Sequence, residues 1–579
     1  MPENAILTDW QAGWETALRH WSRFTQLMQP RWCLTTDDEA QEGMGDSFAM
    51  IRHMDHAVVI SLRKVKEAGV EPFAVEILAH EIGHHVYCPA NLTDHGRMLA
   101  RMKHALPYHE DKAPFVANLY ADLLINDRLQ RQQSLRMAEV YQALGNTSDD
   151  RLWQCYMRTY EVLWGLMRGT LSGKLDDQIE ADARLAARLV RVYSKYWLDG
   201  AGRFAALCLP YFLDENQDGT SVPMQGWFDL GKTGQNGFPD GLTEIDAAET
   251  EGALHPSLDP ALNGGAQPKP EAIKPEDQLG GQKKIDRYRG IVEYGDLLRS
   301  MGVLADEQEI AIRYYRERAR PHLIAFPSVR QPKITEKLPE GYQRWQWGTP
   351  LSEIDWMKSV MTSPLVVPGL TTMQRVRGEV VGHDPEKQPI DLYIGIDCSG
   401  SMPNPRRQIS YPTLAATIMG LSAMRARARV MACLSGEPGS SVATEDFVRD
   451  ERAMLELLTG YLGTGYAFGI HRLTPVFQDR KPQDRPCHLL VITDQDIFSM
   501  LDSPENGRSG WEVAEMARKN ARAGATFVLH MPYGWRDNDV DKLRKIGWDV
   551  YRLYDWAELV DFARDFSHQL YAQTQNLTA

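Results

Sequence analysis

The stretch DLYIGIDCSGSM, residues 391–402, joins an apolar run typical of a β-strand to a polar loop that follows it directly. Three further apolar runs, ARVMACL, HLLVIT and ATFVLHM, alternate with amphipathic helical patterns between about 388 and 579. This alternation predicts a Rossmann-like α/β domain with a parallel central sheet. The loop would then lie at the carboxyl end of a strand, where such sheets bind ligands.

The loop carries oxygen ligands for a hard cation. Asp397 ends the strand, and Ser399 and Ser401 follow in a D-x-S-x-S pattern. Thr464 lies in the glycine-flanked loop YLGTGYAFG, and Asp494 follows the run HLLVIT. Because Mg²⁺ prefers an octahedron of oxygen ligands, these residues predict a magnesium site, with Mn²⁺ or Ca²⁺ as alternatives.

Position by position, these five residues resemble the metal-ion-dependent adhesion site (MIDAS) of von Willebrand factor A (vWA) domains. The resemblance covers about 190 residues, although Gln495 stands where the family usually has glycine. It implies a site for recognition, in which an acidic residue of a protein partner completes the coordination of the metal.

A second metal motif lies in VEILAHEIGHHVYC, residues 75–88, where His80, Glu81 and His84 form an H-E-x-x-H pattern. On a helix, positions i and i+4 project from one face, so both imidazoles can bind one Zn²⁺. Glu81 would lie beside the open coordination position, where it can act as the general base towards water.

The third zinc ligand is predicted from the helical run NLYADLLINDRL, which begins at Asn118. Asn118, Asp122 and Asn126 recur every four residues and share one face. Asp122 would complete a shell of two histidines and one carboxylate, and the two asparagines would hydrogen-bond the ligands from outside. The metzincin continuation is excluded because Ala90 stands at the required position. Alternatives for the third ligand are Asp127, Glu110 and His109.

This arrangement resembles that of gluzincins, with Asp in place of the usual Glu. The patterns A-H-E-x-x-H and Y-A-D-x-x-I-N-D also resemble the metallopeptidase-like domain that precedes a vWA-like domain in a bacterial family. That resemblance covers about a hundred residues and implies peptide hydrolysis. The runs YYRERARPHLIAFP and LPEGYQRWQWGTPLSEIDW resemble the region before vWA domains in bacterial proteins that work with MoxR-type AAA+ ATPases, which implies such a partner.

Composition divides the chain into four segments. We expect a mainly helical α+β zincin-like domain at 1–213, a linker at 214–285, a helical connecting region at 286–387 and the vWA domain at 388–579. The linker segment holds 11 Gly and 7 Pro, with 13 acidic against 5 basic residues. It includes GWFDLGKT, which lacks the strand and helix of a P-loop, and DENQDGT, which favours an acidic turn over a Ca²⁺ site.

Charge and cysteine usage limit the environment and the partners. The 64 basic and 78 acidic residues give a formal charge of −14, which argues against a nucleic acid or an anionic membrane as the main partner. Seven scattered cysteines are typical of reduced thiols. Neither a signal peptide nor a long apolar span is visible, so the sequence predicts a cytoplasmic protein.

The leading hypothesis is a zinc-dependent metallopeptidase whose vWA domain recruits a partner or substrate, in a complex with a MoxR-type ATPase. One alternative is a non-catalytic vWA adaptor with a structural or degenerate zinc site. Another is a chelatase-type subunit.

Overall fold

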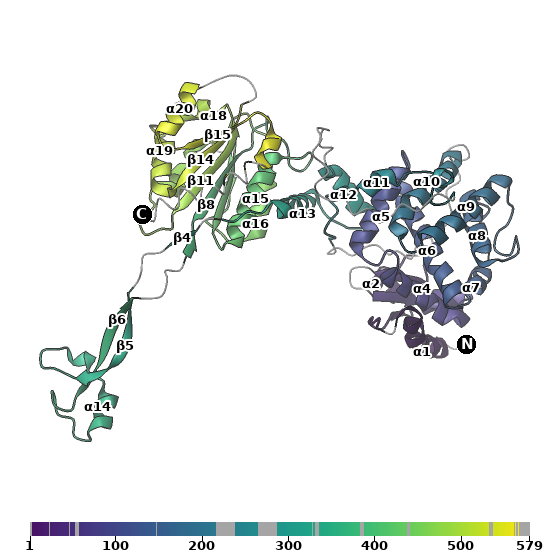
Figure 1. Ribbon diagram of the computed structural model, residues 1–579, viewed down its shortest axis with the longest axis horizontal. Coiled ribbons are helices and arrows are strands. Elements are labelled where there is room, and N and C mark those ends of the chain that lie inside the picture. Colours follow the sequence, from purple (N-terminus) through teal and green to yellow (C-terminus); the bar gives the residue numbers. More distant parts are fainter. Residues whose placement is uncertain are drawn as a thin grey trace. The chain divides into compact units, whose positions relative to one another are not determined.

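The computed structural model describes two compact units, Met1–Glu317 with Arg406–Ile409, and Arg318–Pro405 with Ser410–Ala579. The described residues are 3–560, 562 and 566, except 23, 46, 53–56, 146–147, 216–237, 264–286, 327, 331–334, 382–386, 437–439 and 532–536. The chain is thus a mixed α/β protein with a helical first unit and a second unit built on a sheet (Figure 1). Across these ranges, no helix combines the length and apolar composition needed to cross a bilayer.

The first unit is mainly helical and contains a small sheet. Strand β3 (Ala57–Ser61) pairs in parallel with β1 (Arg31–Cys33) and antiparallel with β2 (Ala49–Arg52). The helices are α1 (Glu3–Trp21), α2 (Thr36–Glu42), α3 (Leu62–Glu67), α4 (Ala74–Val86), α5 (Leu92–Ala105), α6 (Ala113–Gln132), α7 (Met137–Leu144), α8 (Arg151–Trp164), α9 (Asp177–Tyr193), α10 (Trp197–Glu215), α11 (Ala247–Glu251), α12 (Ile291–Ser300) and α13 (Glu307–Ala319), which ends just beyond this unit.

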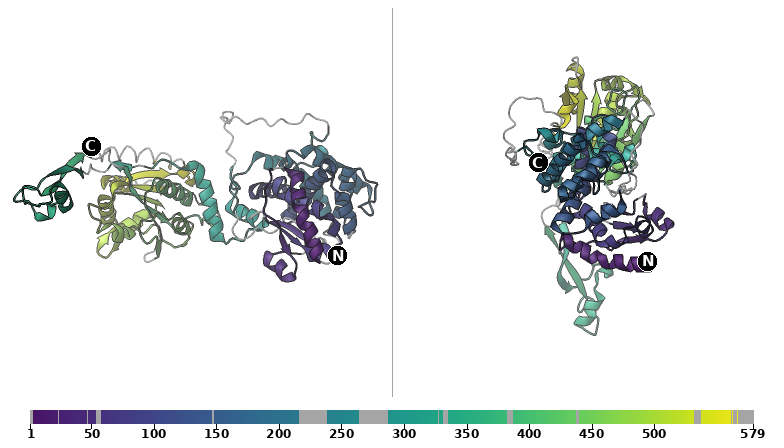
Figure 2. Two further views of the ribbon diagram at one scale, coloured as in Figure 1. Left: turned by 90° about the horizontal axis from the view of Figure 1, so that it is seen from below. Right: turned by 90° about the vertical axis from the view of Figure 1, so that its right-hand side faces the viewer.

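The core of this unit fixes the position of α4. One apolar face of α4 packs with Trp10 and Trp14 of α1 and with Val58 and Ile60 of β3. Figure 2 shows α1, drawn in purple, beside this small sheet. Helix α4 also contacts α6, which begins with Pro114 in its first turn and is rich in Ala and Leu, two good helix formers. The helices predicted for the H-E-x-x-H motif and for the run NLYADLLINDRL are confirmed as α4 and α6.

Part of the segment expected as a linker belongs to this unit. Of that segment, residues 238–263 are described, and Leu242 and Thr243 are buried there. Glu249 is buried as well, and Arg289 pairs with both of its carboxylate oxygens at 2.7 Å, which compensates its buried charge. The GWFDLGKT segment lies outside the described residues, as do residues 216–220 of DENQDGT.

The second unit has a mostly parallel six-stranded sheet in its described part. The strand order is β10-β9-β8-β11-β14-β15, and β10 (Ser441–Ala443) is antiparallel to its neighbour. The other strands are β8 (Asp391–Asp397), β9 (Val430–Ser435), β11 (Cys487–Asp494), β14 (Arg522–His530) and β15 (Asp549–Leu553). The four apolar runs of the sequence become β8, β9, β11 and β14, which confirms the parallel sheet.

Helices cover both faces of this sheet. Tyr393 points into the core on the α19 side, whereas the next residue, Ile394, points towards Gly420 of α15, because side chains alternate along a strand. The helices are α15 (Tyr411–Arg425), α16 (Glu451–Leu458), α17 (Thr474–Phe477), α18 (Ile497–Asp502), α19 (Gly510–Ala521) and α20 (Asp537–Lys545). The sheet therefore has a buried centre.

The expected helical connecting region also contains strands. An antiparallel ribbon joins β5 (Thr335–Arg344) to β6 (Met373–Val381), and α14 (Trp356–Thr362) lies at its end (Figure 1). A shorter pair joins β4 (Ser328–Arg330) to β7 (Lys387–Pro389). The ribbon end is closed by Trp345 N–H donating to the Thr372 carbonyl and by Arg375 bonding the Asp355 carboxylate at 2.8 Å. Its strands are far apart in sequence, so local periodicity did not reveal them.

Candidate metal centre

The structure brings His80, His84 and Asp122 together inside the first unit. The two histidines lie one turn apart on α4, and Asp122 faces them from α6. Their ligand atoms all lie within 4.8 Å of one another. The Nε2 atoms are 3.2 Å apart, and Asp122 Oδ1 lies 3.6 Å from His80 Nε2 and 3.3 Å from His84 Nε2. Asp122 is thus placed as the third member of the group.

The other nitrogen of each ring has its own hydrogen-bond partner. His84 Nδ1 lies 3.1 Å from the Cys88 carbonyl oxygen, which can only accept, so Nδ1 carries the proton. His80 Nδ1 lies 2.7 Å from Asn126 Oδ1. In the neutral rings, both Nε2 lone pairs therefore point at one another and at the carboxylate. Outer hydrogen bonds of this kind orient histidines that bind metals.

The residues present fit a metal cation. Two imidazole lone pairs and one carboxylate oxygen converge, and within the described ranges Asp122 Oδ1 accepts no hydrogen bond. Burial raises the pKa of Asp122 to about 7, against the lowering effect of His80. Three acceptors packed in a buried space repel one another unless a cation lies between them. Two nitrogens and one oxygen are ligands that suit zinc among other divalent metals.

The group is buried together with Glu81, and two asparagines contact it. His84 is 0% exposed, Glu81 1%, Asp122 4% and His80 8%, so the group lies under the surface of the unit. Asn118 Nδ2 donates to Asp122 Oδ2 at 3.1 Å, which leaves Oδ1 facing the histidines. The structure therefore places Asn118 and Asn126 in contact with the ligands, one on the carboxylate and one on an imidazole.

The alternative third ligands lie elsewhere. Asp127 forms an ion pair with Arg131 of the same helix. His109 stacks on Phe212 with ring centroids 6.2 Å apart, and Glu110 is exposed, with its carboxylate accepting from the Tyr108 N–H. None of the three belongs to the convergent group found among the described residues.

Four further residues, His95, Cys88, Tyr141 and Tyr160, lie around the group and belong to no sequence motif. Burial, with a smaller effect of His84, lowers the pKa of His95 to about 4. The Cys88 carbonyl holds His84, and the hydroxyls of Tyr141 and Tyr160 accept from Asn126 Nδ2 at 3.0 and 2.9 Å. In the sequence these residues read as ordinary core positions, so no local pattern pointed to them.

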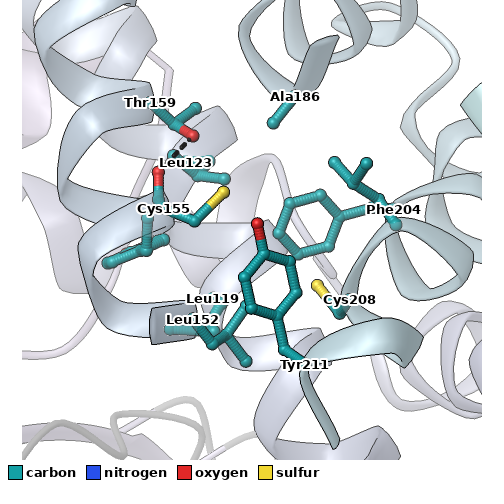
Figure 3. Close-up of a pocket in the computed structure, with 11 residues that line it drawn as sticks. Leu119, Leu123, Leu152, Cys155, Thr159, Ala186, Phe204, Cys208 and Tyr211 are labelled. Carbon is teal, nitrogen blue, oxygen red and sulfur yellow. Dashed lines mark hydrogen bonds between the residues drawn. The ribbon is translucent and has the colours of Figure 1, made fainter. Parts of the chain in front are cut away.

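A small pocket lies in the helical unit but does not include the candidate metal-binding group of His80, His84 and Asp122. Figure 3 shows Cys155, Cys208 and Tyr211 among its lining residues, from α8 and α10. Burial raises the pKa of Cys155 to about 12 and that of Cys208 well above its usual value. The Tyr211 hydroxyl donates to Asp182 at 2.8 Å. Protonated thiols in an apolar lining make this a packing feature.

The second group of predicted residues gathers at the carboxyl edge of the large sheet. Ser399 N–H donates to Asp397 Oδ1 at 2.8 Å, and the Thr493 hydroxyl donates to Asp397 Oδ2 at 2.7 Å. The hydroxyls of Ser399 and Ser401 are 2.9 Å apart, and Ser401 donates to Asp494 Oδ2 at 2.8 Å. Asp397, Ser399, Ser401 and Asp494 thus form one continuous hydrogen-bonded chain.

Thr464 joins this edge through its backbone. Its carbonyl accepts from Gly400 N–H at 2.7 Å, and Ser399 and Thr464 form a parallel bridge. Its side chain lies over Gly436, where any Cβ would collide with it. Burial raises the pKa of Asp397 to about 6, and the charge of Asp494 adds to the effect. Two carboxylates and several hydroxyls on one edge suit a hard cation.

Comparison with known proteins finds one partial structural similarity to report. No family model matches the chain, and no curated protein is similar to it. Among solved structures the chain is similar to a von Willebrand factor type A from Catenulispora acidiphila, at 16% identity and a TM-score of 0.22. The similarity covers 32% of this chain and 44% of that chain, less than half of its length.

Proposed function

We propose that the chain is a zinc-dependent metallopeptidase whose C-terminal unit is a vWA domain with a MIDAS. The observation that carries the first part is the convergence of His80 Nε2, His84 Nε2 and Asp122 Oδ1 with both Nδ1 atoms already bonded. A carboxylate follows the first histidine directly, as a general base requires.

Each residue has a role in this reaction. Bound zinc would supply Lewis-acid polarisation of the peptide carbonyl. Glu81 takes the proton from the attacking water and passes it to the leaving amine. Asn118 and Asn126 hold Asp122 and His80 in place. The hydroxyls of Tyr87 and Tyr120 donate to the backbone carbonyls of Ser194 and Trp197. We therefore assign neither of them to stabilising the oxyanion that would form from the peptide carbonyl.

The test begins with metal content by mass spectrometry on the full chain purified without chelators. We expect about one zinc per chain, lost in His80→Ala and in Asp122→Ala and retained in Glu81→Gln and in His85→Ala, the control on the same helix. Glu81→Gln should reduce hydrolysis of a peptide library by at least about 100-fold. Zinc retained in His80→Ala would exclude this metal site.

A second candidate function is a non-catalytic adaptor with a structural metal. The burial of Glu81 and of the three proposed ligands favours it, because a peptide must reach the general base and the metal for hydrolysis. Under this candidate the wild-type chain holds one zinc but hydrolyses no peptide, and Glu81→Gln changes nothing. Under the peptidase hypothesis, the part of the first unit that buries the group must move to admit the substrate.

For the C-terminal unit we propose a Mg²⁺ held by Asp397, Ser399, Ser401, Thr464 and Asp494, with Mn²⁺ or Ca²⁺ as alternatives. A partner carboxylate would complete its coordination, and a MoxR-type AAA+ ATPase is the proposed partner. The chain of hydrogen bonds between Asp397 and Asp494 supports this assignment. Co-elution with such an ATPase should require Mg²⁺ and be lost in Ser401→Ala. Co-elution in the presence of a chelator would contradict it.

A further inference from the structure

Asn126 connects the metal-binding group to a cluster of buried tyrosines. Its Oδ1 lies 2.7 Å from His80 Nδ1, and its Nδ2 lies 3.0 Å from the Tyr141 hydroxyl and 2.9 Å from the Tyr160 hydroxyl. Asn126 is only 1% exposed, so water does not replace these bonds. The two tyrosines come from α7 and α8, whereas Asn126 is on α6.

A count of protons fixes which way the Asn126 amide points. The hydroxyl oxygens of Tyr141 and Tyr160 are 3.1 Å apart, so one of their two protons lies between them. At most one proton then remains for Asn126. A carbonyl oxygen in this place would face at least one oxygen lone pair, whereas an amide NH₂ finds an acceptor in both. The hydroxyl pair therefore selects Nδ2 and turns Oδ1 towards His80.

The amide orientation in turn decides the tautomer of His80. Oδ1 can only accept, so Nδ1 must carry the ring proton and Nε2 keeps its lone pair. A reversed amide would donate to Nδ1 and move the ring proton to Nε2, the atom that faces His84 and Asp122. A protonated Nε2 has no lone pair with which to bind a metal.

We propose that Tyr141 and Tyr160 are positioning residues that select the metal-binding tautomer of His80 by orienting Asn126. This inference rests on the proposed metal site. It assigns a function to two hydroxyls that touch neither the metal ligands nor Glu81 in any hydrogen bond described above. Tyr160 and Tyr141 act as a pair. If one hydroxyl is removed, the proton of the other no longer lies between them and can point at Asn126, so the amide can turn either way.

Tyr156 provides a matched control within the same cluster. Its hydroxyl lies 2.8 Å from that of Tyr160, and its side chain is also buried on α8. Tyr156→Phe removes one hydroxyl from the cluster but leaves the Tyr141–Tyr160 pair intact. A merely structural role for the hydroxyls predicts equal effects for all three tyrosines.

The experiment compares Tyr141→Phe, Tyr160→Phe and Tyr156→Phe in the full chain, with Zn²⁺ as the probe. Competition with a chelator should show zinc affinity reduced by about 10- to 100-fold in the first two variants and unchanged in Tyr156→Phe. Side-chain ¹⁵N shifts of His80 in the metal-free protein, assigned with His80→Gln, should show the Nδ1–H form in the wild type. They should show a mixture of tautomers in the first two variants.

A second pair of variants distinguishes an effect on the orientation of Asn126 from an effect on core packing. Asn126→Asp places an acceptor-only carboxylate against His80, so adding Tyr160→Phe there should leave the tautomer unchanged. One tautomer in all the variants would overturn the inference, even if zinc binding is normal. Failure of the wild-type chain to bind zinc would instead overturn the proposed function, and the ¹⁵N shifts would still decide the role of the tyrosines.

Discussion

At the scale of single residues, the position of a proton decides what several buried side chains can do. The histidines of the metal-binding group keep their Nε2 lone pairs because the Cys88 carbonyl and Asn126 occupy Nδ1. His488 of β11 shows the same dependence in the C-terminal unit. Its Nδ1 donates to the Ala523 carbonyl at 3.0 Å, and its Nε2 accepts from the Thr526 hydroxyl at 3.1 Å.

His488 should make the C-terminal unit sensitive to acid. Burial lowers its pKa from 6.5 to about 4, and the ring is 1% exposed. Between these two values the unfolded chain binds the proton and the folded chain does not, so stability falls as the pH falls. Each pKa unit corresponds to about 1.4 kcal/mol, so the loss reaches about 3 kcal/mol at pH 4. Native-state hydrogen exchange of β11 peptides between pH 7.5 and 4.5 measures this loss of stability.

His488→Gln should reduce the dependence of the stability of this unit on pH, because an amide does not titrate. His104→Gln is the control, since that side chain is exposed on α5. If β11 in His488→Gln loses protection with acid as steeply as in the wild type, His488 is not the group responsible.

At the scale of elements, the metal-binding group depends on how closely α4 approaches α6. Gly83 lies at their contact, next to His84. A Cβ at this position would lie 2.6 Å from Ile125 Cγ2 on α6 and 2.7 Å from Trp21 Cζ2 on α1. Both neighbours are held in the core, and the Trp21 indole donates to the Ala79 carbonyl at 2.6 Å. The absence of a side chain at Gly83 is what allows His84 to reach Asp122.

Gly83→Ala should therefore weaken both folding and metal binding. Overpacking of this kind costs about 1–3 kcal/mol, and the separation of the helices should reduce zinc affinity by about 10-fold or more. Thermal unfolding and chelator competition measure the two effects. Gly13→Ala is the matched control, because its Cβ would meet nothing closer than 3.5 Å. Equal zinc affinity in the two variants would contradict this account of the helix contact.

The sequence predicted elements better where the signal was local. Helical spacing placed His80 and His84 on one face of a helix and Asp122 on the face of a second helix. In the structure these faces of α4 and α6 lie against each other, and the three side chains meet. The strands of the large sheet were visible as apolar runs, because a parallel strand is buried on both sides. Asn126 was predicted to touch a ligand from its four-residue spacing alone.

The remaining features depend on contacts between distant segments. Tyr141 and Tyr160 lie 15 and 34 residues from Asn126, so no periodicity connects them. The β5–β6 ribbon pairs Thr335 with Val381 across an intervening helix, which local propensity does not reveal. Cys88 acts through its carbonyl, a group that every residue has.

At the scale of the whole molecule, the two candidate metal sites lie in different compact units. Each has its own core and its own ligand chemistry, with imidazole nitrogens in the first unit and hydroxyls and carboxylates in the second. Ligands that bind only the folded state stabilise the unit that holds them. The four-segment division of the chain and the cytoplasmic location stay predictions.

We therefore expect two independent responses to metals in the full chain. A zinc-selective chelator should increase hydrogen exchange in peptides that cover α4 and α6 and leave β8 and β11 unchanged. Added Mg²⁺ should protect the loop after β8 and the end of β11, because Asp397 and Asp494 repel each other until a cation lies between them. At 100 times its dissociation constant, a ligand adds about 2.7 kcal/mol of stability.

Asp397→Ala should abolish the Mg²⁺ response without affecting the zinc response, and His80→Ala should do the reverse. A single variant that abolishes both responses would show that the two sites are coupled, and would contradict their independence.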